Sequence, residues 1–228
     1  MFDAVITYLD SIKARDPAPR SRWEILIYPG VWALAFHRAA HWLFEADLFF
    51  LARVVNHFSR FLTAIDIHPG AKIGKNFFID HGFVVIGETA EIGDNVTVYQ
   101  GATLGGTNPT SGEGGKRHPT IEDDAIISLG AAVLGPVTVG KRARIAANAV
   151  VTKDVPEGAT MVGIPARPLL VDAQEYQMTF MPYGTPCRDQ FDPATQQLEI
   201  LKCEMEQLQK RLAELTDNKD AAARWTSA

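Results

Sequence analysis

The chain has 228 residues, with 22 Lys and Arg against 27 Asp and Glu, and 46% of its residues are hydrophobic. This length and apolar content suffice for one medium domain or two small ones with a buried core. The formal net charge of −5 offers no basic surface for nucleic acid or for an anionic membrane. The two cysteines, Cys187 and Cys203, are too few for a disulfide framework and fit a reducing compartment. The N-terminus lacks the basic segment of a signal peptide, and charges break the apolar stretches, so we expect a cytoplasmic protein.

Residues 1–62 predict an α-helical domain. Helices should break at Asp16-Pro17 and at Tyr28-Pro29-Gly30, because proline lacks the backbone donor that a helix needs. Apolar side chains are dense enough for a helical bundle that caps the fold that follows. They are Trp32, Leu34, Phe36, Trp42, Leu43, Phe44, Leu48, Leu51, Val54, Val55, Phe58 and Leu62.

Two histidines of this domain have the spacing of metal ligands. His37 and His41 lie four residues apart on a predicted helix, as two zinc ligands would. The pair lacks an intervening glutamate and a third ligand, so we predict structural packing instead.

Branched aliphatic residues then recur every six residues, with a single step of seven between Ile79 and Ile86. Neither the helical period of 3.6 nor the strand period of 2 explains an apolar residue at every sixth position. The pattern is typical of a parallel β-helix, in which each hexad forms a short strand and a corner and three hexads close a coil. The aliphatic residues should form an internal column; they are Ile67, Ile73, Ile79, Ile86, Ile92, Val98, Leu104, Ile121, Ile127, Val133, Val139, Ile145 and Val151.

Eleven extra residues interrupt the repeat between Leu104 and Ile121. Residues 105–119 must therefore loop out of the β-helix, which we assign to residues 63–170. A long loop on a rigid scaffold often carries function. The alternative is a flexible decoration, which fits the Gly- and Ser-rich centre of the loop but not its end, Lys116-Arg117-His118.

Residues 171–228 form a predicted C-terminal extension. Apolar residues spaced 3,4,3,4,3 within 195–216 predict an amphipathic helix with a short heptad seam. The seam is either an oligomer contact, which we favour, or a face packed on its own subunit. It consists of Leu198, Leu201, Met205, Leu208, Leu212 and Leu215.

Four motifs of the repeat combine residues that can carry chemistry. Asp66-Ile67-His68-Pro69 opens the repeat and Ile79-Asp80-His81-Gly82 follows, while Leu104-Gly105-Gly106-Thr107 and Arg117-His118-Pro119 flank the loop. In this order the motifs resemble those of the serine O-acetyltransferases, within the hexapeptide-repeat acyltransferase superfamily. The resemblance runs from about Arg15 to Arg167.

The resemblance implies both a fold and a reaction. The fold is of the α+β class: an α-helical N-terminal domain, a left-handed parallel β-helix, and here a C-terminal helix that could form a short coiled coil. The reaction transfers acetyl from acetyl-CoA to the L-serine hydroxyl, giving O-acetyl-L-serine and CoA in cysteine biosynthesis. Subunits of such enzymes associate as homotrimers, often paired into hexamers, with active sites between neighbouring β-helices.

The catalytic roles fall on His81 and Asp66. A serine hydroxyl is a weak nucleophile at neutral pH, so its attack on a thioester needs a base whose pKa lies near the working pH. We expect His81 to be that base and Asp66 to hold its other ring nitrogen. The two lie 15 residues apart, close to one coil of the repeat. His68 receives no catalytic role.

The resemblance also implies recognition residues for a free amino acid. Arg117 and His118 are suited to the serine carboxylate, and His118 could also support proton transfer by His81. Asp80 and Asp16 are suited to the ammonium group. From the residues alone, Asp16 could equally cap a helix.

The donor, acetyl-CoA, should lie against another set of residues. A glycine at position 106 lets a backbone N–H approach the developing oxyanion, and it matches the family's acetyl-CoA position. Leu129, Arg144 and Ala147 match contacts to the pantetheine arm, although Leu129 replaces a smaller residue. We expect no metal cofactor.

Three other functions are open on the sequence. Another hexapeptide acyltransferase would act on a sugar, homoserine or antibiotic hydroxyl, but the charged set above suits a zwitterion. A β-helix carbonic anhydrase would gather three histidines on zinc, which His68, His81 and His118 could supply. A scaffold that only binds cysteine synthase should lack His81 or Asp66, and both are present.

The resemblance raises two questions of regulation. Many family members dock a C-terminal Ile into cysteine synthase, whereas this chain ends in Trp225-Thr226-Ser227-Ala228, so we expect weak or absent binding of that kind. Members are commonly inhibited by L-cysteine at the serine site, and we expect the same here.

Overall fold

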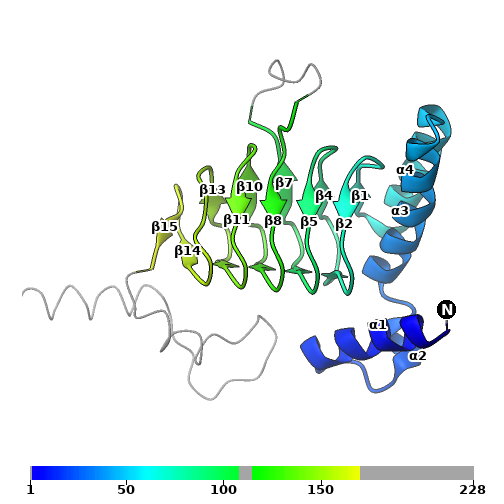
Figure 1. The fold of residues 1–228 in the computed structure, drawn as a ribbon. Helices are drawn as coiled ribbons and strands as arrows, with labels where there is room; N and C mark the ends of the chain where they lie inside the picture. The colour runs from blue at the N-terminus through cyan, green and yellow to red at the C-terminus, as the bar shows by residue number, and fades with distance from the viewer. Residues whose placement is uncertain (1, 108–114, 170–228) are drawn as a thin grey trace, which may run out of the picture. The chain divides into compact units, whose positions relative to one another are not determined.

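A computed structural model describes residues 2–107 and 115–169 of the chain (Figure 1). Within these ranges, α-helices come first and short strands follow, and no described helix has the length and apolar content needed to cross a membrane. The predicted C-terminal extension, with its heptad helix and both cysteines, lies outside the described residues. The helices are α1 (Phe2–Arg15), α2 (Arg22–Ile25), α3 (Pro29–Glu45) and α4 (Phe49–Thr63).

The strands form three sheets that the chain visits in turn from β1 to β13, one short strand at a time, and β14 and β15 then both belong to sheet C. Neighbours in each sheet pair in parallel, except that β14 and β15 are antiparallel. Sheet A contains β1 (Asp66–Ile67), β4 (Val85–Ile86), β7 (Thr103–Gly105), β10 (Ala132–Leu134) and β13 (Val150–Val151). Sheet B contains β2 (Lys72–Ile73), β5 (Glu91–Ile92), β8 (Thr120–Ile121) and β11 (Thr138–Val139). Sheet C contains β3 (Phe78–Ile79), β6 (Thr97–Val98), β9 (Ile126–Ile127), β12 (Arg144–Ile145), β14 (Thr160–Val162) and β15 (Arg167–Pro168).

The six-residue repeat forms the core of this stack. All thirteen aliphatic repeat residues are buried, with exposed fractions of 0–8%. In sheet A, Ile67 pairs with Ile86, and Ile86 pairs with Leu104, so each aliphatic residue sits on its counterpart in the next coil. The predicted order, N-terminal helices followed by a parallel β-helix, is therefore confirmed as helices followed by three parallel sheets. The inserted segment leaves after β7 and returns before β8 (Figure 1).

The first two helices pack on β3, the first strand of sheet C. Leu9 and Ile12 of α1 and Ile25 of α2 pack on Phe78 of β3. The helix α1 ends at Arg15, directly before the predicted break, and α3 begins at Pro29, the second predicted break. Gly30 is required in α3, because a Cβ there would lie 2.3 Å from the Ile79 carbonyl oxygen.

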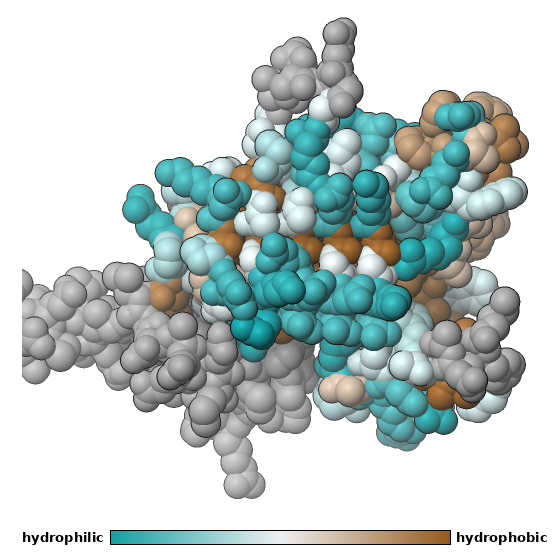
Figure 2. All heavy atoms as spheres, in the orientation of Figure 1, coloured by the Kyte–Doolittle hydropathy of each residue, from teal (hydrophilic) through white to brown (hydrophobic). Residues whose placement is uncertain are grey.

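The helix α4 departs from the predicted apolar bundle. Its buried face carries small and polar residues, while its large apolar residues point outward. Phe50 is 78% exposed and Phe61 is 86% exposed, and Figure 2 shows apolar residues gathered over α3 and α4. Small residues let α4 approach the first coil closely, and the large apolar side chains are exposed in the described part of the chain. The buried residues are Ala52, Asn56, Ser59 and Thr63.

Candidate active site

The structure brings three predicted site residues together in one pocket. Asp16 from the end of α1 faces Asp80 and His81 from the corner after β3. The pocket has a volume of about 390 Å³ and combines two carboxylates with an imidazole. Its lining residues are Arg15, Asp16, Pro17, Ala18, Tyr28, Pro29, Asp80, His81 and Tyr99.

His81 owes its position to the one irregular step of the repeat. The seven-residue step between Ile79 and Ile86 falls at this corner, where His81 and Phe83 both adopt positive φ, 60° and 59°. The extra residue lets the His81 side chain project outward, and it is 67% exposed. Its Nε2 atom lies 3.6 Å from Oδ1 of Asp80. The imidazole is therefore open to a substrate.

The two carboxylates of the pocket differ in their partners. Asp16 accepts hydrogen bonds from the Tyr28 hydroxyl at 2.8 Å and from the Ala18 backbone N–H at 2.9 Å. The alternative role of Asp16 as a helix cap is wrong, because the next helix, α2, is capped by Ser21. Asp80 is only 16% exposed, and burial, together with the nearby Asp16 charge, raises its pKa although His81 opposes the shift. Such a pair favours a cationic ligand.

Sequence reasoning missed the residue that anchors this pocket, Arg15. Its guanidinium donates to the backbone carbonyls of Asn76 and Asn95 at 2.6 and 3.2 Å and stacks 5.4 Å above the Phe78 ring centroid. It thereby ties the end of α1 to two corners of the β-helix. Since Asp16 is the next residue, this clamp sets the position of the Asp16 carboxylate.

Asp66 has partners other than His81 in this structure. Its Oδ1 accepts a hydrogen bond from Asn56 at 3.2 Å, and its Oδ2 lies 3.4 Å from the Arg60 guanidinium. The His81 corner is nevertheless close in the fold, because the Phe83 N–H donates to the carbonyl of Ala64, two residues before Asp66. The backbone thus brings the predicted pair near each other, while the side chains have different partners.

Arg117 and His118 lie at the opposite end of the sheet A strands from His81. His81 belongs to the corner that precedes β4, whereas Arg117 and His118 pack on the corner that follows β4. Arg117 Nη2 is 2.5 Å from Glu88 Oε2 and its side chain is 32% exposed. In one chain, therefore, the two halves of the predicted site lie at opposite ends of the strands of sheet A.

His118 is tightly enclosed at this second corner. It is 8% exposed, and its Nδ1 atom lies 3.1 Å from the backbone nitrogen and 3.0 Å from the hydroxyl of Thr89. Burial lowers its pKa, with Arg117 adding to the effect. Gly106 is beside it, because a Cβ there would lie 3.7 Å from His118 Nε2. Glu88 and Thr89, to which sequence reasoning assigned no role, therefore hold Arg117 and His118.

The residues predicted to contact acetyl-CoA lie in three different parts of the β-helix. Leu129 and Ala147 belong to the same row of corners as His81, since the Asn148 N–H donates to the Leu129 carbonyl one coil away. Arg144 lies on β12, on the outer face of sheet C. Gly106 lies at the opposite row, with His118.

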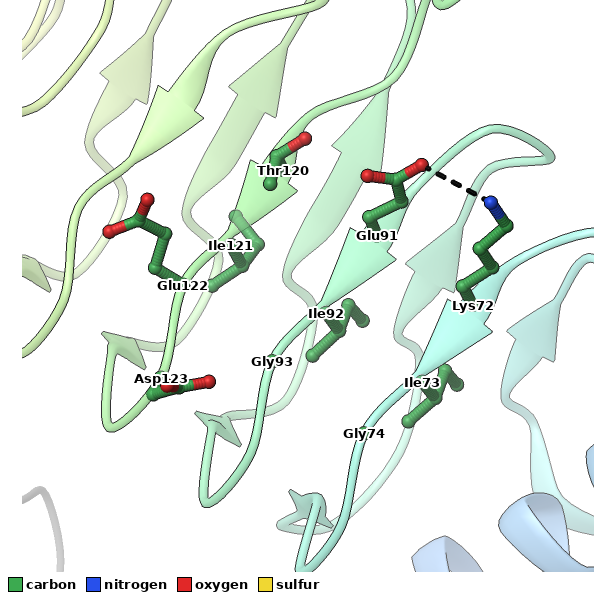
Figure 3. A pocket seen from close by; sticks show the side chains of 10 residues that line it. All are labelled: Lys72, Ile73, Gly74, Glu91, Ile92, Gly93, Thr120, Ile121, Glu122 and Asp123. Atoms are coloured by element: carbon green, nitrogen blue, oxygen red, sulfur yellow. Dashed lines mark ion pairs between the residues drawn. The ribbon is translucent and has the colours of Figure 1, made fainter.

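A wider groove of about 480 Å³ crosses sheet B and contains no predicted site residue. Figure 3 shows Ile73, Ile92 and Ile121 in a row along its floor, flanked by charged side chains. The charges are paired, with Lys72 Nζ 3.6 Å from Glu91 Oε1. The groove is thus the outer surface of stacked coils.

The histidines of the helical domain pack against neighbouring residues and do not form a metal site with other described side chains. His37 is 3% exposed and its ring centroid lies 5.6 Å from that of His41. His41 Nδ1 bonds the Pro69 carbonyl at 2.7 Å. Within the described part of a single chain, no three His, Cys, Asp or Glu side chains form a group that could hold a metal ion.

Comparison with known proteins decides the family. A serine acetyltransferase of Bacillus pumilus is 49% identical over 210 residues, which cover 91% of this chain and 93% of that protein. The serine acetyltransferase of Bacillus subtilis is 48% identical over 208 residues, 90% of this chain and 94% of that protein. The chain belongs to the serine acetyltransferase family. It is accordingly an acyltransferase, which confirms the resemblance and the enzyme class predicted from the motifs. No family model matches the chain.

Solved structures of this family share the fold. The serine acetyltransferase of Neisseria gonorrhoeae in complex with serine matches with a TM-score of 0.68 and 38% identity, over 73% of this chain and 67% of that one. A serine acetyltransferase in complex with cysteine gives 0.69 and 39%, over 73% and 68%. A complex with CoA gives 0.67 and 38%, again over 73% and 68%. Relatives of this chain thus bind serine, cysteine and CoA.

Proposed function

We propose that this chain transfers the acetyl group of acetyl-CoA to the hydroxyl of L-serine, giving O-acetyl-L-serine and CoA for cysteine biosynthesis. The observation that carries the proposal is the pocket in which Asp16 and Asp80 flank His81. Burial, together with the neighbouring Asp16 charge, raises the pKa of Asp80, and a substrate ammonium would stabilise the charged form of this carboxylate. A neutral sugar hydroxyl would leave both carboxylates uncompensated.

In this proposal His81 is the general base. Its imidazole removes the proton of the serine hydroxyl as the oxygen attacks the thioester carbonyl carbon. The new C–O bond gives a tetrahedral oxyanion, which the backbone N–H at Gly106 stabilises. Collapse breaks the C–S bond, and the proton held by His81 passes to the departing thiolate of CoA.

Asp66 orients the base. Once the His81 ring turns from Asp80 toward sheet A, the Asp66 carboxylate can accept from its second nitrogen and fix the useful tautomer. The exposure of His81 leaves this rotation unhindered. Asp80 is then released to meet the ammonium group together with Asp16.

The complete site forms between two copies of the chain. Arg117 and His118, which take the serine carboxylate, are at the opposite end of the sheet A strands from His81, so a neighbouring copy must supply them. The outer face of sheet A supports this arrangement, because Val85 on it is 43% exposed and apolar. Phe61 and Phe83, 86% and 76% exposed, extend the apolar surface onto the end of α4. A head-to-tail ring of three copies would bury this surface.

Acetyl-CoA lies along the row of corners that leads away from His81. Leu129 and Ala147 follow His81 along that row, and Arg144 is on the adjoining sheet C. This order places the thioester at His81 and the rest of CoA toward the later coils. No metal takes part in the reaction.

Several finer assignments complete the proposal. The β-helix is left-handed, and the domains are residues 1–62, 63–170 and 171–228. The enzyme works in the cytoplasm as a homotrimer or a dimer of trimers. L-cysteine competes with serine.

The test is the release of CoA from acetyl-CoA by the purified full-length chain. L-serine should support release, while homoserine and a sugar acceptor should give much slower rates. Equal rates with the sugar acceptor would overturn the proposal, because two carboxylates and an arginine have no role in holding a neutral acceptor. A CoA release that depended on added zinc would also contradict it.

A further inference from the structure

The corner after β4 contains a hydrogen-bond arrangement that determines how His118 can act. The backbone N–H of Thr89 points at Nδ1 of His118 at 3.1 Å. A backbone N–H can only donate, so Nδ1 must be the unprotonated, accepting nitrogen of the ring. The single proton of the neutral imidazole therefore sits on Nε2.

The Thr89 hydroxyl also requires Nδ1 of His118 to be a hydrogen-bond acceptor. Its oxygen accepts the backbone N–H groups of Arg117 and His118, each at 3.0 Å, which occupies both lone pairs. The hydroxyl proton is left to point at His118 Nδ1, 3.0 Å away. One threonine thus fixes the backbone of Arg117 and His118 and also the tautomer of the His118 ring.

The ring is held from its other side by a glycine. A Cβ at Gly87 would lie 2.0 Å from Cδ2 and 2.1 Å from Nε2 of His118, so any larger residue would displace the imidazole. On the side of the inserted loop, a Cβ at Gly106 would lie 3.7 Å from Nε2. Nε2 therefore lies beside the proposed oxyanion donor.

We infer that Thr89 is a positioning residue that locks His118 as a neutral Nε2–H donor, so that His118 hydrogen-bonds the substrate carboxylate and cannot accept a proton from the reacting hydroxyl. This inference rests on the proposed function for the identity of the substrate. It assigns proton removal to His81 alone. Protonation of His118 would place an Nδ1–H against the Thr89 N–H, which disfavours the cation in addition to burial.

The test compares Thr89→Val with Thr89→Ser in the full-length enzyme. Valine keeps the shape and the backbone N–H but removes the hydroxyl, whereas serine keeps the hydroxyl. Nitrogen-15 spectra of the histidine rings, with the His118 signals assigned by their loss in His118→Gln, should show Nε2–H and unprotonated Nδ1 in the wild type and in Thr89→Ser. In Thr89→Val the retained backbone N–H should keep Nδ1 unprotonated, and the Nδ1 signal should shift because it loses the hydrogen bond from the hydroxyl.

Kinetics give the second readout. Thr89→Val should raise the KM for serine by roughly 10- to 100-fold, the loss expected for a hydrogen bond to a charged group, with kcat changed much less. Thr89→Ser should stay within about threefold of the wild type. An Nδ1–H signal for wild-type His118, or a Thr89→Val variant with wild-type spectra and KM, would overturn the inference. If the wild type failed to acetylate serine, the spectra would still decide the tautomer.

Discussion

Acid should destabilise this protein through one buried histidine of α3. His37 is 3% exposed, and burial lowers its pKa from 6.5 to about 3, with the nearby His41 and Arg38 acting in the same direction. In the unfolded chain the same imidazole takes up a proton near pH 6.5. The unfolded state therefore binds more protons than the folded state over the whole range between these two values.

The sign and size of the effect follow from this difference. A folded pKa below the unfolded one contributes stability that is present above pH 6.5 and is lost as the pH falls. Between pH 7 and pH 5 the loss from His37 amounts to about 2 kcal/mol, because at pH 5 the unfolded ring is almost fully protonated and the folded ring is not. Any folded pKa below about 4 gives the same result at pH 5.

Urea unfolding at pH 7 and pH 5, at a fixed protomer concentration, measures this loss. The wild type should lose about 2 kcal/mol more than His37→Leu between the two pH values. His57→Gln is the control, because His57 is exposed on α4, and it should behave as the wild type. His37→Gln serves as a second variant if leucine prevents folding. Equal pH dependence of the wild type and both His37 variants would refute the reasoning.

The remaining predictions concern catalysis. His81→Ala should lower kcat by a factor on the order of 10² to 10⁴, measured by CoA release, and near-normal turnover would exclude it as the base. Asp66→Asn should lower kcat by roughly 10- to 100-fold with a small change in the KM for serine, since it orients the base. If Asp80→Asn lowered kcat in this way and Asp66→Asn did not, Asp80 would be the residue that orients His81. Arg117→Ala should chiefly raise the KM for serine, and a pure kcat effect would contradict carboxylate binding.

The repeat made the core predictable from the sequence. A six-residue period can be satisfied only by stacked short strands, so the buried state of Ile67, Ile86 and Leu104 followed directly from their spacing. The helix α4 was less predictable. Its apolar residues indicate that a surface must be covered, but they do not say whether the covering surface belongs to the same chain.

The pocket residues were predictable as a set, but their geometry was not. The motifs indicated Asp16, Asp80 and His81, and the structure brings these three together. The sequence could not show that Asp66 contacts Asn56 and Arg60, because those partners come from a different element, α4. The seven-residue step was the available signal that the His81 corner differs from the others.

The second half of the site illustrates another limit. Glu88 and Thr89 lie in the motif Gly87-Glu88-Thr89-Ala90, but the sequence indicates no role for them, which they gain because the chain folds their corner against Arg117 and His118. Arg15 is similar, since its partners at Asn76 and Asn95 lie on two successive coils. Contacts between residues that are distant in sequence, and not residue type, give these side chains their roles.

Co-expression of two inactive variants tests the shared active site most directly. His81→Ala removes the base at one end of the sheet A strands, and His118→Ala removes a serine contact at the other end. At a serine concentration well below the wild-type KM, each homotrimer should have little activity. In a ring of three that contains both variants, one interface in three pairs an intact His81 with an intact His118, so the mixed trimers should have about a third of the wild-type rate. Mixed trimers, purified by a different tag on each variant, with no activity above the separate variants would contradict the account.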